Sequence, residues 1–293
     1  MISIILFHYE TLAIPYISFI FFRFGHWGVD IFLFLSGWGC VFALEKHNLR
    51  RFYLRRALRI LPKCLLAGSL ILIIAEISGI HNSGLHVLGR LFSLNLWYVQ
   101  AILVYYLFAP FIYTALKQLR FTALIVLTAI AIALGACTDF YGEFALNWIM
   151  WRFPIFIIGM YFAIFDFKPK PVHYWLSLVA FLCAVLIRIF YSQGPTQYYI
   201  LALSIPFVCG LLCKLRKIAE TTRLLPIVET IGVYSLEIYL IHEYILKILG
   251  TIKIPVFFKH LLFFSSTVVI CYLLKRVADK WSLSPSRRPE IQH

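Results

Sequence analysis

The sequence predicts an all-helical (all-α) fold, a polytopic bundle of membrane-spanning helices that uses the whole chain. Of its 293 residues, 62% are hydrophobic and only 14% are charged, and the mean hydropathy is +0.87. A soluble globular protein of this size does not carry so much apolar surface, which is typical of membrane proteins instead. The apolar residues also form long runs, and the basic residues gather between them.

About ten spans can be read along the chain, since crossing a hydrocarbon core takes about 20 helical residues. Turn residues and charges mark their boundaries. The predicted spans cover residues 1–9, 27–45, 62–79, 96–116, 121–138, 146–165, 172–191, 198–213, 227–249 and 256–276. The connections are short, with no linker, low-complexity tract or internal repeat. We therefore expect one domain over residues 1–293.

The first span is the shortest. Only about nine residues precede Glu10, too few to cross a core of ~30 Å. The helix therefore begins within the membrane, or the true start lies upstream of Met1. We expect a first helix that is short or truncated.

The basic residues predict the orientation of the spans. Of the 27 lysines and arginines, 20 fall in segments that face the cytoplasm if the second span ends there, and five fall in the alternate segments. Loops rich in lysine and arginine stay on the cytoplasmic side, so the C-terminus is expected inside. The net charge of +14 thus indicates orientation, and no nucleic-acid binding is expected.

A basic stripe follows the second span. At 100° per residue, Arg51, Arg55, Arg56, Arg59 and Lys63 fall within roughly 140° of one helical face. Like charges four residues apart repel, so the stripe favours a polyanionic partner. Anionic lipid headgroups would serve, at about 1 kcal/mol for each basic residue, and so would the phosphates of a nucleotide cofactor. The density of arginine, which binds phosphate with two hydrogen bonds, favours the cofactor.

Ionisable residues in or beside the first two spans are candidates for chemistry, since a charge at a helix centre costs about 2.5–3.5 kcal/mol on insertion scales. His8 and Glu10 close the first span at its expected outer end. A neutral imidazole there can accept a proton near pH 7, although an interfacial histidine that reaches water is the alternative. Asp30 lies one turn into the second span, and Gly37 on the same face would let another helix approach. We expect Asp30 to pair with or orient a basic group, in a structural or a catalytic role.

Further candidates lie in later spans. Arg152 is a cation buried by position in the sixth span, beside a proline. The ninth span is the most polar one, with Ser235 and His242 seven residues apart on one face, so we expect it to line a cavity. Trp97 begins the fourth span, where aromatic residues commonly mark the membrane interface.

Motifs of soluble enzymes and metal sites are absent from the sequence. It holds no Gly-rich phosphate loop, no HExxH and no GxSxG. The seven cysteines are scattered, without paired metal-ligand spacing. We therefore expect no metal ion.

Several segments, in order, resemble the acyltransferase-3 family of integral-membrane acyltransferases, which includes O-acetyltransferases of bacterial surface polysaccharides. The two most specific are adjacent: GVDIFLFLSGW at 28–38, which contains Ser36, and FYLRRALRILP at 52–62. The others are His8 after an apolar run, LWYVQAILVYYLFAP at 96–110, RFPIFIIG at 152–159 and YSLEIYLIH at 234–242. The resemblance covers almost the entire chain.

The resemblance implies transfer of an acyl group, usually acetyl, from cytoplasmic acyl-CoA to a hydroxyl of a glycan or lipid-linked sugar outside a bacterial inner membrane. His8 is similar to the family's essential histidine, a general base for the acceptor hydroxyl. Arg56 and Arg59 match its RxxR pair, which holds the CoA phosphates. The expected catalytic residues are His8, Glu10 and Asp30, the donor-binding residues Arg55, Arg56, Arg59 and Lys63, and the substrate-binding or supporting residues Ser36, Trp97, Arg152, Ser235 and His242.

Two other functions stay open. One is a transporter or flippase of a lipid-linked sugar, with the polar ninth helix as its pathway; inverted repeats would favour it, and the sequence shows none. The other is an inactive, truncated family member, because relatives carry an arginine about ten residues before the histidine, and here that position would precede Met1. An in-frame basic helix encoded upstream of Met1 would favour the active enzyme.

Overall fold

The protein is described by a computed structural model over residues 4–5, 27–77, 97–140, 144–167, 170–190, 218, 220–222 and 224–281. This part of the chain forms eight α-helices and contains no strand, so the prediction of an all-helical fold is confirmed. The chain divides into two compact units. Unit 1 comprises Met1–His26, Leu54–Leu96 and Glu229–His293, and unit 2 comprises Trp27–Tyr53 and Trp97–Val228.

Within the described ranges, four helices are long and apolar enough to cross a membrane. They contain the stretches Gly28–Lys46, Trp97–Thr138, Leu146–Ile164 and Val256–Lys280. Large apolar side chains on them are exposed, including Phe111 at 71% and Phe257 at 72%. Helices that satisfy their own backbone hydrogen bonds and present such faces are suited to lipid, as expected for a membrane helix bundle. The predicted spans at 198–213 and, apart from residues 4 and 5, at 1–9 lie outside the described residues.

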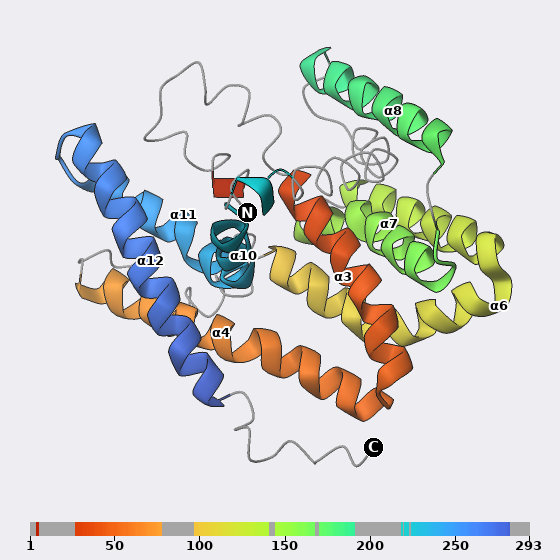
Figure 1. The fold of residues 1–293 in the computed structure, drawn as a ribbon, viewed down its shortest axis with the longest axis horizontal. Helices are drawn as coiled ribbons and strands as arrows, with labels where there is room; N and C mark the ends of the chain where they lie inside the picture. The colour runs from red at the N-terminus through yellow and green to blue at the C-terminus, as the bar shows by residue number, and fades with distance from the viewer. Residues whose placement is uncertain are drawn as a thin grey trace. The chain divides into compact units, whose positions relative to one another are not determined.

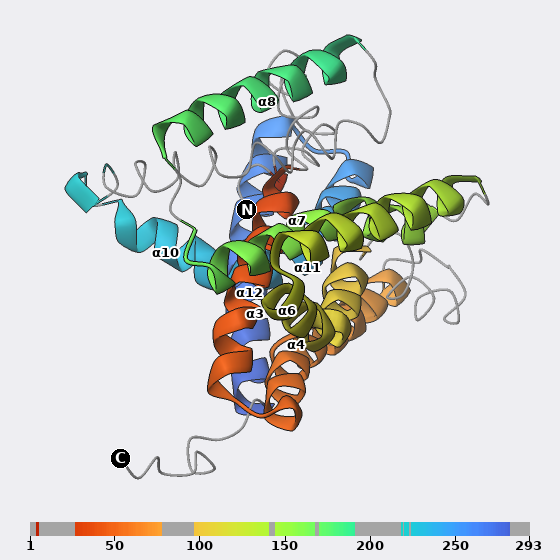
Figure 2. The same ribbon diagram turned by 90° about the vertical axis from the view of Figure 1, so that its right-hand side faces the viewer.

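Unit 2 is built around three helices that pack on one another, α3, α6 and α7 (Figure 1 and Figure 2). Its helices are α3 (Trp27–Lys46), α6 (Trp97–Phe140), α7 (Phe144–Ile164) and α8 (Pro171–Phe190). Within α6 the backbone is not helical at Arg120, where φ is 50° and ψ is −124°, and the chain turns sharply there (Figure 1). The two spans predicted on either side of residues 117–120 are therefore two helical segments joined at a tight turn. A positive φ is uncommon for a residue other than glycine.

The backbones of α3 and α7 approach each other at two glycines. A Cβ on Gly37 would overlap the carbonyl oxygen of Phe156, and a Cβ on Gly159 would overlap the carbonyl oxygen of Phe34. Small residues at a crossing allow membrane helices to pack at this distance. The expectation that Gly37 lets another helix approach is confirmed, and that helix is α7.

Gly37→Ala is expected to destabilise the protein, whereas Gly39→Ala on the same helix is not. The added methyl group at Gly37 meets backbone atoms, which cannot move aside as a flexible side chain can, and overpacking of this kind costs about 1–3 kcal/mol. Nothing lies within 4 Å of a Cβ at Gly39, where alanine removes the conformational penalty of a helical glycine. Thermal unfolding of the two variants in detergent measures the difference. Equal midpoints for both would contradict the close crossing.

Unit 1 contains most of α4 (Leu49–Ile77), the end of α10 (Leu225–Val233), and all of α11 (Ser235–Thr251) and α12 (Val256–Trp281). Helix α4 starts where the side chain of Asn48 accepts a 2.9 Å hydrogen bond from the backbone N–H of Arg51, a side-chain cap. The basic stripe and the apolar segment after it form this one continuous helix, with Pro62 inside it. Helix α11 packs on α12.

The predicted span 227–249 requires a correction, because it is divided into α10 and α11 at Tyr234. The backbone there has φ −93° and ψ 8°. The N–H of Tyr234 still donates to the carbonyl of Thr230 at 3.1 Å, and the N–H of Ile238 donates to the carbonyl of Tyr234 at 3.0 Å. The break is therefore a kink, across which the hydrogen-bonded ladder continues. Helix α11 can therefore run in a different direction from α10.

Candidate functional site

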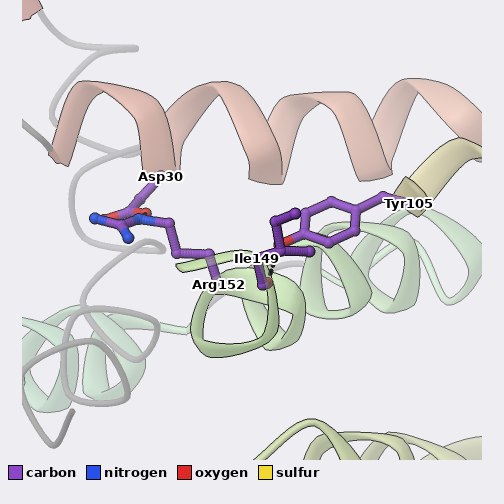
Figure 3. A network of polar contacts seen from close by, with 4 residues as sticks. All are labelled: Asp30, Tyr105, Ile149 and Arg152. Atoms are coloured by element: carbon purple, nitrogen blue, oxygen red, sulfur yellow. Dashed lines mark hydrogen bonds and ion pairs between the residues drawn. The ribbon is translucent and has the colours of Figure 1, made fainter. Parts of the chain in front are cut away.

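A buried ion pair joins α3 to α7 in unit 2. The Nε of Arg152 donates to Oδ1 of Asp30 at 2.8 Å, and the two side chains are 0% and 1% exposed (Figure 3). Asp30 lies in the first turn of α3, where the helix dipole also favours a negative charge. The expectation that Asp30 pairs with a basic group is confirmed. Its partner is the cation that position alone marks as buried in the sixth span.

Two tryptophans contact the same guanidinium. The Cζ of Arg152 lies 4.6 Å from the ring centroid of Trp97 and 4.8 Å from that of Trp148. The two ring centroids are 5.4 Å apart. Such cation–π contacts are worth about 2 kcal/mol or more when the cation is removed from water. Trp97 therefore does more than mark a membrane interface, and Trp148 is a partner that sequence reasoning missed.

A third contact ties α6 to α7 beside this pair. The buried hydroxyl of Tyr105 donates to the backbone carbonyl of Ile149, one turn before Arg152 on α7 (Figure 3). Asp30, Trp97 and Arg152 all lie in the N-terminal halves of their helices. Their contacts therefore hold the N-terminal halves of α3, α6 and α7 against one another. Asp30 is enclosed by this packing, a geometry that suits positioning. Its catalytic role stays a prediction.

Unit 1 holds a separate basic pocket of about 450 Å³. Three helical segments form its wall: the first half of α4, the kink before α11 with the start of α11, and the end of α12. The lining residues are Arg55, Leu58, Arg59, Lys63, Gly232, Val233, Ser235, Leu236, Lys275, Ala278 and Asp279. Four of them are basic and one is acidic, so the wall favours an anion.

The helical stripe explains which basic residues reach this pocket. Arg55, Arg59 and Lys63 are four residues apart and follow one face of α4 into it. Arg56 is half-buried and is not a lining residue, because it lies 100° round the helix from Arg55. Three of the four predicted donor-binding residues are thus brought together.

The pocket also contains residues from other helices. Ser235 lines it, as expected for the polar ninth span. Sequence reasoning missed Lys275 and Asp279, which form an ion pair of 3.8 Å on α12. Their signal is a basic and an acidic residue four apart at the expected cytoplasmic end of the last span. The start of α11 and the end of α12 therefore supply parts of the pocket wall that α4 does not provide.

An ion pair beside the pocket joins α4 to α11. The Nζ of Lys63 lies 2.5 Å from Oε1 of Glu237, whose side chain is 0% exposed, whereas that of Lys63 is 13% exposed. Glu237 lies in the first turn of α11 and is not itself a lining residue. Sequence reasoning placed Glu237 in a polar helix without assigning it a role.

His242 lies five residues beyond Glu237 on α11 and is 2% exposed. Its Nδ1 is 3.0 Å from the carbonyl oxygen of Ile238 and 2.9 Å from that of Tyr239. Carbonyl oxygens only accept hydrogen bonds, so Nδ1 carries the proton in this geometry. His242 does not line the pocket, and both of these carbonyls belong to its own helix. Its supporting role stays a prediction.

Three predicted residues remain, His8, Glu10 and Ser36. His8 and Glu10 fall outside the described residues. Ser36 is half-buried on α3 in unit 2, about 120° round the helix from Asp30. In the described ranges, no three His, Cys, Asp or Glu side chains are grouped in a way that could hold a metal ion.

Comparison with known proteins identifies the family. A family model described as "Acyltransferase domain" matches residues 1–276 of the 293-residue chain. No curated protein and no solved structure matches the chain. The match spans nearly all of the chain and favours an O-acyltransferase over the transporter. The chain therefore belongs to the acyltransferase-3 family of membrane-bound acyltransferases.

Proposed function

We propose that the protein transfers an acetyl group from cytoplasmic acetyl-CoA to a hydroxyl of an extracytoplasmic glycan or lipid-linked sugar. It would do so in a bacterial inner membrane, with its C-terminus in the cytoplasm. The thioester C–S bond breaks, a C–O ester bond forms, and the proton of the acceptor hydroxyl ends on the thiol of CoA. The product is an O-acetylated component of the cell envelope.

The basic pocket of unit 1 is the observation that carries this proposal. CoA bears a diphosphate and a further phosphate, and the pocket offers the side chains of Arg55, Arg59, Lys63 and Lys275. Arginine binds phosphate through two parallel hydrogen bonds, and lysine acts as a point charge. The volume of about 450 Å³ lies within the range of roughly 300–1,000 Å³ that is usual for small-molecule sites.

The direction of transfer is supported by agreement between the pocket and the charge distribution. The first half of α4, the start of α11 and the end of α12 meet at the pocket. In the orientation predicted from the lysines and arginines, the basic half of α4 and the end of α12 face the cytoplasm, and the start of α11 lies in the cytoplasmic half of the ninth span. Acyl-CoA is a cytoplasmic metabolite, so a donor site on this side is chemically consistent.

Proposed roles of the other residues follow from their positions. His8, by its resemblance to the family histidine, takes the proton from the acceptor hydroxyl, and Glu10 beside it orients the imidazole. Asp30 acts through Arg152, holding one end of α3 on α7. Ser235 can hydrogen-bond the donor from the pocket wall. The apolar surroundings of a helix bundle would keep water away from the thioester.

Sealed membrane vesicles of opposite orientation test the proposal. Everted vesicles, supplied outside with radiolabelled acetyl-CoA, are expected to incorporate label into the glycan and lipid-linked sugar fraction. Right-side-out vesicles are expected to do so only after permeabilisation, because CoA does not cross the bilayer. Mild alkali should release the label, since it cleaves O-esters and spares amides.

Vesicles from cells that lack the protein provide the background. Equal labelling of both intact vesicle types would contradict the cytoplasmic donor site. Label that resists mild alkali would contradict transfer to a hydroxyl.

A further inference from the structure

We propose that Glu237 is an internal anion that competes with the phosphates of the donor for Lys63. In this role it sets how tightly the pocket holds acyl-CoA and how readily it releases CoA. The inference rests on the proposed donor site. It adds a function for a buried carboxylate that lies behind the pocket wall.

Lys63 lies between the carboxylate of Glu237 and the basic pocket. Its Nζ is 2.5 Å from the Glu237 carboxylate on one side, and its side chain lines the basic pocket on the other. Among the described residues, the Glu237 carboxylate oxygens have no hydrogen-bond partner and no ion pair besides that with Lys63. The buried carboxylate therefore depends on this one ammonium group.

Burial makes the competition strong. A fully buried carboxylate without a counter-ion is costly, so Lys63 stays on Glu237 when the pocket is empty. A phosphate that enters the pocket must share the three N–H donors of Lys63 or draw them away. The carboxylate thus cancels part of the attraction that Lys63 would otherwise exert on the phosphate.

The other acid at the pocket is a weaker competitor. Asp279 lies 3.8 Å from Lys275, and its side chain is 56% exposed. Exposed ion pairs are screened by water and salt and contribute about 0–1 kcal/mol. Glu237 is 0% exposed and holds its lysine at the shorter distance. Glu237 is therefore the acid whose charge has the larger effect on an anion in the pocket.

Weakened donor binding has a kinetic use. Donor and product both carry the phosphates, so a pocket that binds them equally tightly lowers KM without speeding the chemical step. When product release limits turnover, tighter binding of CoA slows the enzyme. Because the Glu237 carboxylate pairs with Lys63 again when CoA dissociates, it favours the release of CoA.

A charge-neutralising cycle on the pair tests the inference, with CoA as the probe and titration calorimetry on the purified full chain as the measurement. Glu237→Gln keeps a carbonyl oxygen that can accept a hydrogen bond from Lys63 and removes the charge. We expect the Kd for CoA to fall about tenfold, corresponding to about 1.4 kcal/mol. Lys63→Gln should raise it about tenfold. The double variant Lys63→Gln/Glu237→Gln, which restores the net charge of the pocket, should lie within about threefold of the natural protein.

A matched control separates this effect from a general change in charge. Glu45 pairs with Lys117 at 3.4 Å, is 45% exposed and is absent from the pocket wall. Glu45→Gln should leave the Kd for CoA unchanged. In transfer assays, Glu237→Gln should lower kcat together with KM and increase inhibition by CoA.

Several results would overturn the inference. A Glu237→Gln variant that folds but binds CoA as the natural protein does, or more weakly, makes the pair merely structural. If that variant unfolds, the double variant carries the test, and a loss of affinity beyond about threefold contradicts the competition. Failure of the natural protein to bind CoA would instead remove the donor site itself, and with it the proposed function.

Discussion

Arg152→Ala is expected to lower the free energy of unfolding by about 3–5 kcal/mol, because it leaves the carboxylate of Asp30 buried without its counter-ion. The variant also removes the guanidinium that contacts Trp97 and Trp148. For a chain of this size, such a loss corresponds to a fall in Tm of roughly 10 °C. Thermal unfolding in detergent, followed by intrinsic tryptophan fluorescence, measures it.

Three further variants sharpen this prediction. Asp30→Ala combined with Arg152→Ala should cost little more than either single change, since the two side chains act as a unit. Arg152→Lys keeps the charge but loses the planar group. Its loss in the free energy of unfolding should therefore be smaller than that of Arg152→Ala but larger than zero. Lys117→Ala breaks an exposed ion pair and should cost at most about 1 kcal/mol. Additive losses from Asp30→Ala and Arg152→Ala would contradict a coupled pair.

The helices themselves follow from local properties of the sequence. Apolar runs with charged boundaries predict α3, both halves of α6, α7, α8 and α12, because each needs only its own composition and length to be recognised. The turn at Arg120 falls where Lys117 and Arg120 interrupt the apolar pattern. The kink at Tyr234 has no such signal in the sequence, because neither a proline nor a basic residue lies beside it.

Contacts between helices are harder to predict from one sequence. Asp30 and Arg152 are 122 residues apart. The sequence marks each as a candidate only because a charge in an apolar span is costly. The same rule leaves their pairing open, since several cations could have faced Asp30. Gly37 indicates a close approach, but only the structure identifies Gly159 as its counterpart on α7.

The basic pocket shows the same division. Periodicity places Arg55, Arg59 and Lys63 on one face of α4, which is a local property. The contributions of Ser235, Lys275 and Asp279 depend on how α11 and α12 are placed against that face. The choice between Arg55 and Arg56 also depends on this placement. The family motif selects Arg56 and Arg59, whereas the pocket is lined by Arg55 and Arg59.

Replacing both Arg55 and Arg59 with alanine is expected to weaken CoA binding about 100-fold. Each hydrogen bond to a charged group is worth about 1.5–3 kcal/mol, and both side chains line the pocket but are exposed, so solvent screening reduces the sum. Arg56→Ala should have a smaller effect than Arg55→Ala, because Arg56 is not a lining residue. Lys117→Ala, outside the pocket, should leave CoA binding unchanged.

His8→Ala provides the complementary result. As the proposed base for the acceptor hydroxyl, His8 is expected to be essential for transfer and dispensable for binding CoA. The variant should therefore bind CoA as the natural protein does while transferring no acetyl group above background. Full transfer by His8→Ala would contradict its role, and a loss of CoA binding would move His8 to the donor site.

The most direct measurement is calorimetric titration of CoA into the purified natural protein and into the Arg55→Ala/Arg59→Ala variant. The variant must have the same Tm as the natural protein. If the basic pocket formed by α4, α11 and α12 is the donor site, the natural protein binds CoA and the variant binds it about 100-fold more weakly, by the hydrogen-bond energies above. Equal affinities in the two folded proteins would contradict it and place the donor elsewhere in the chain.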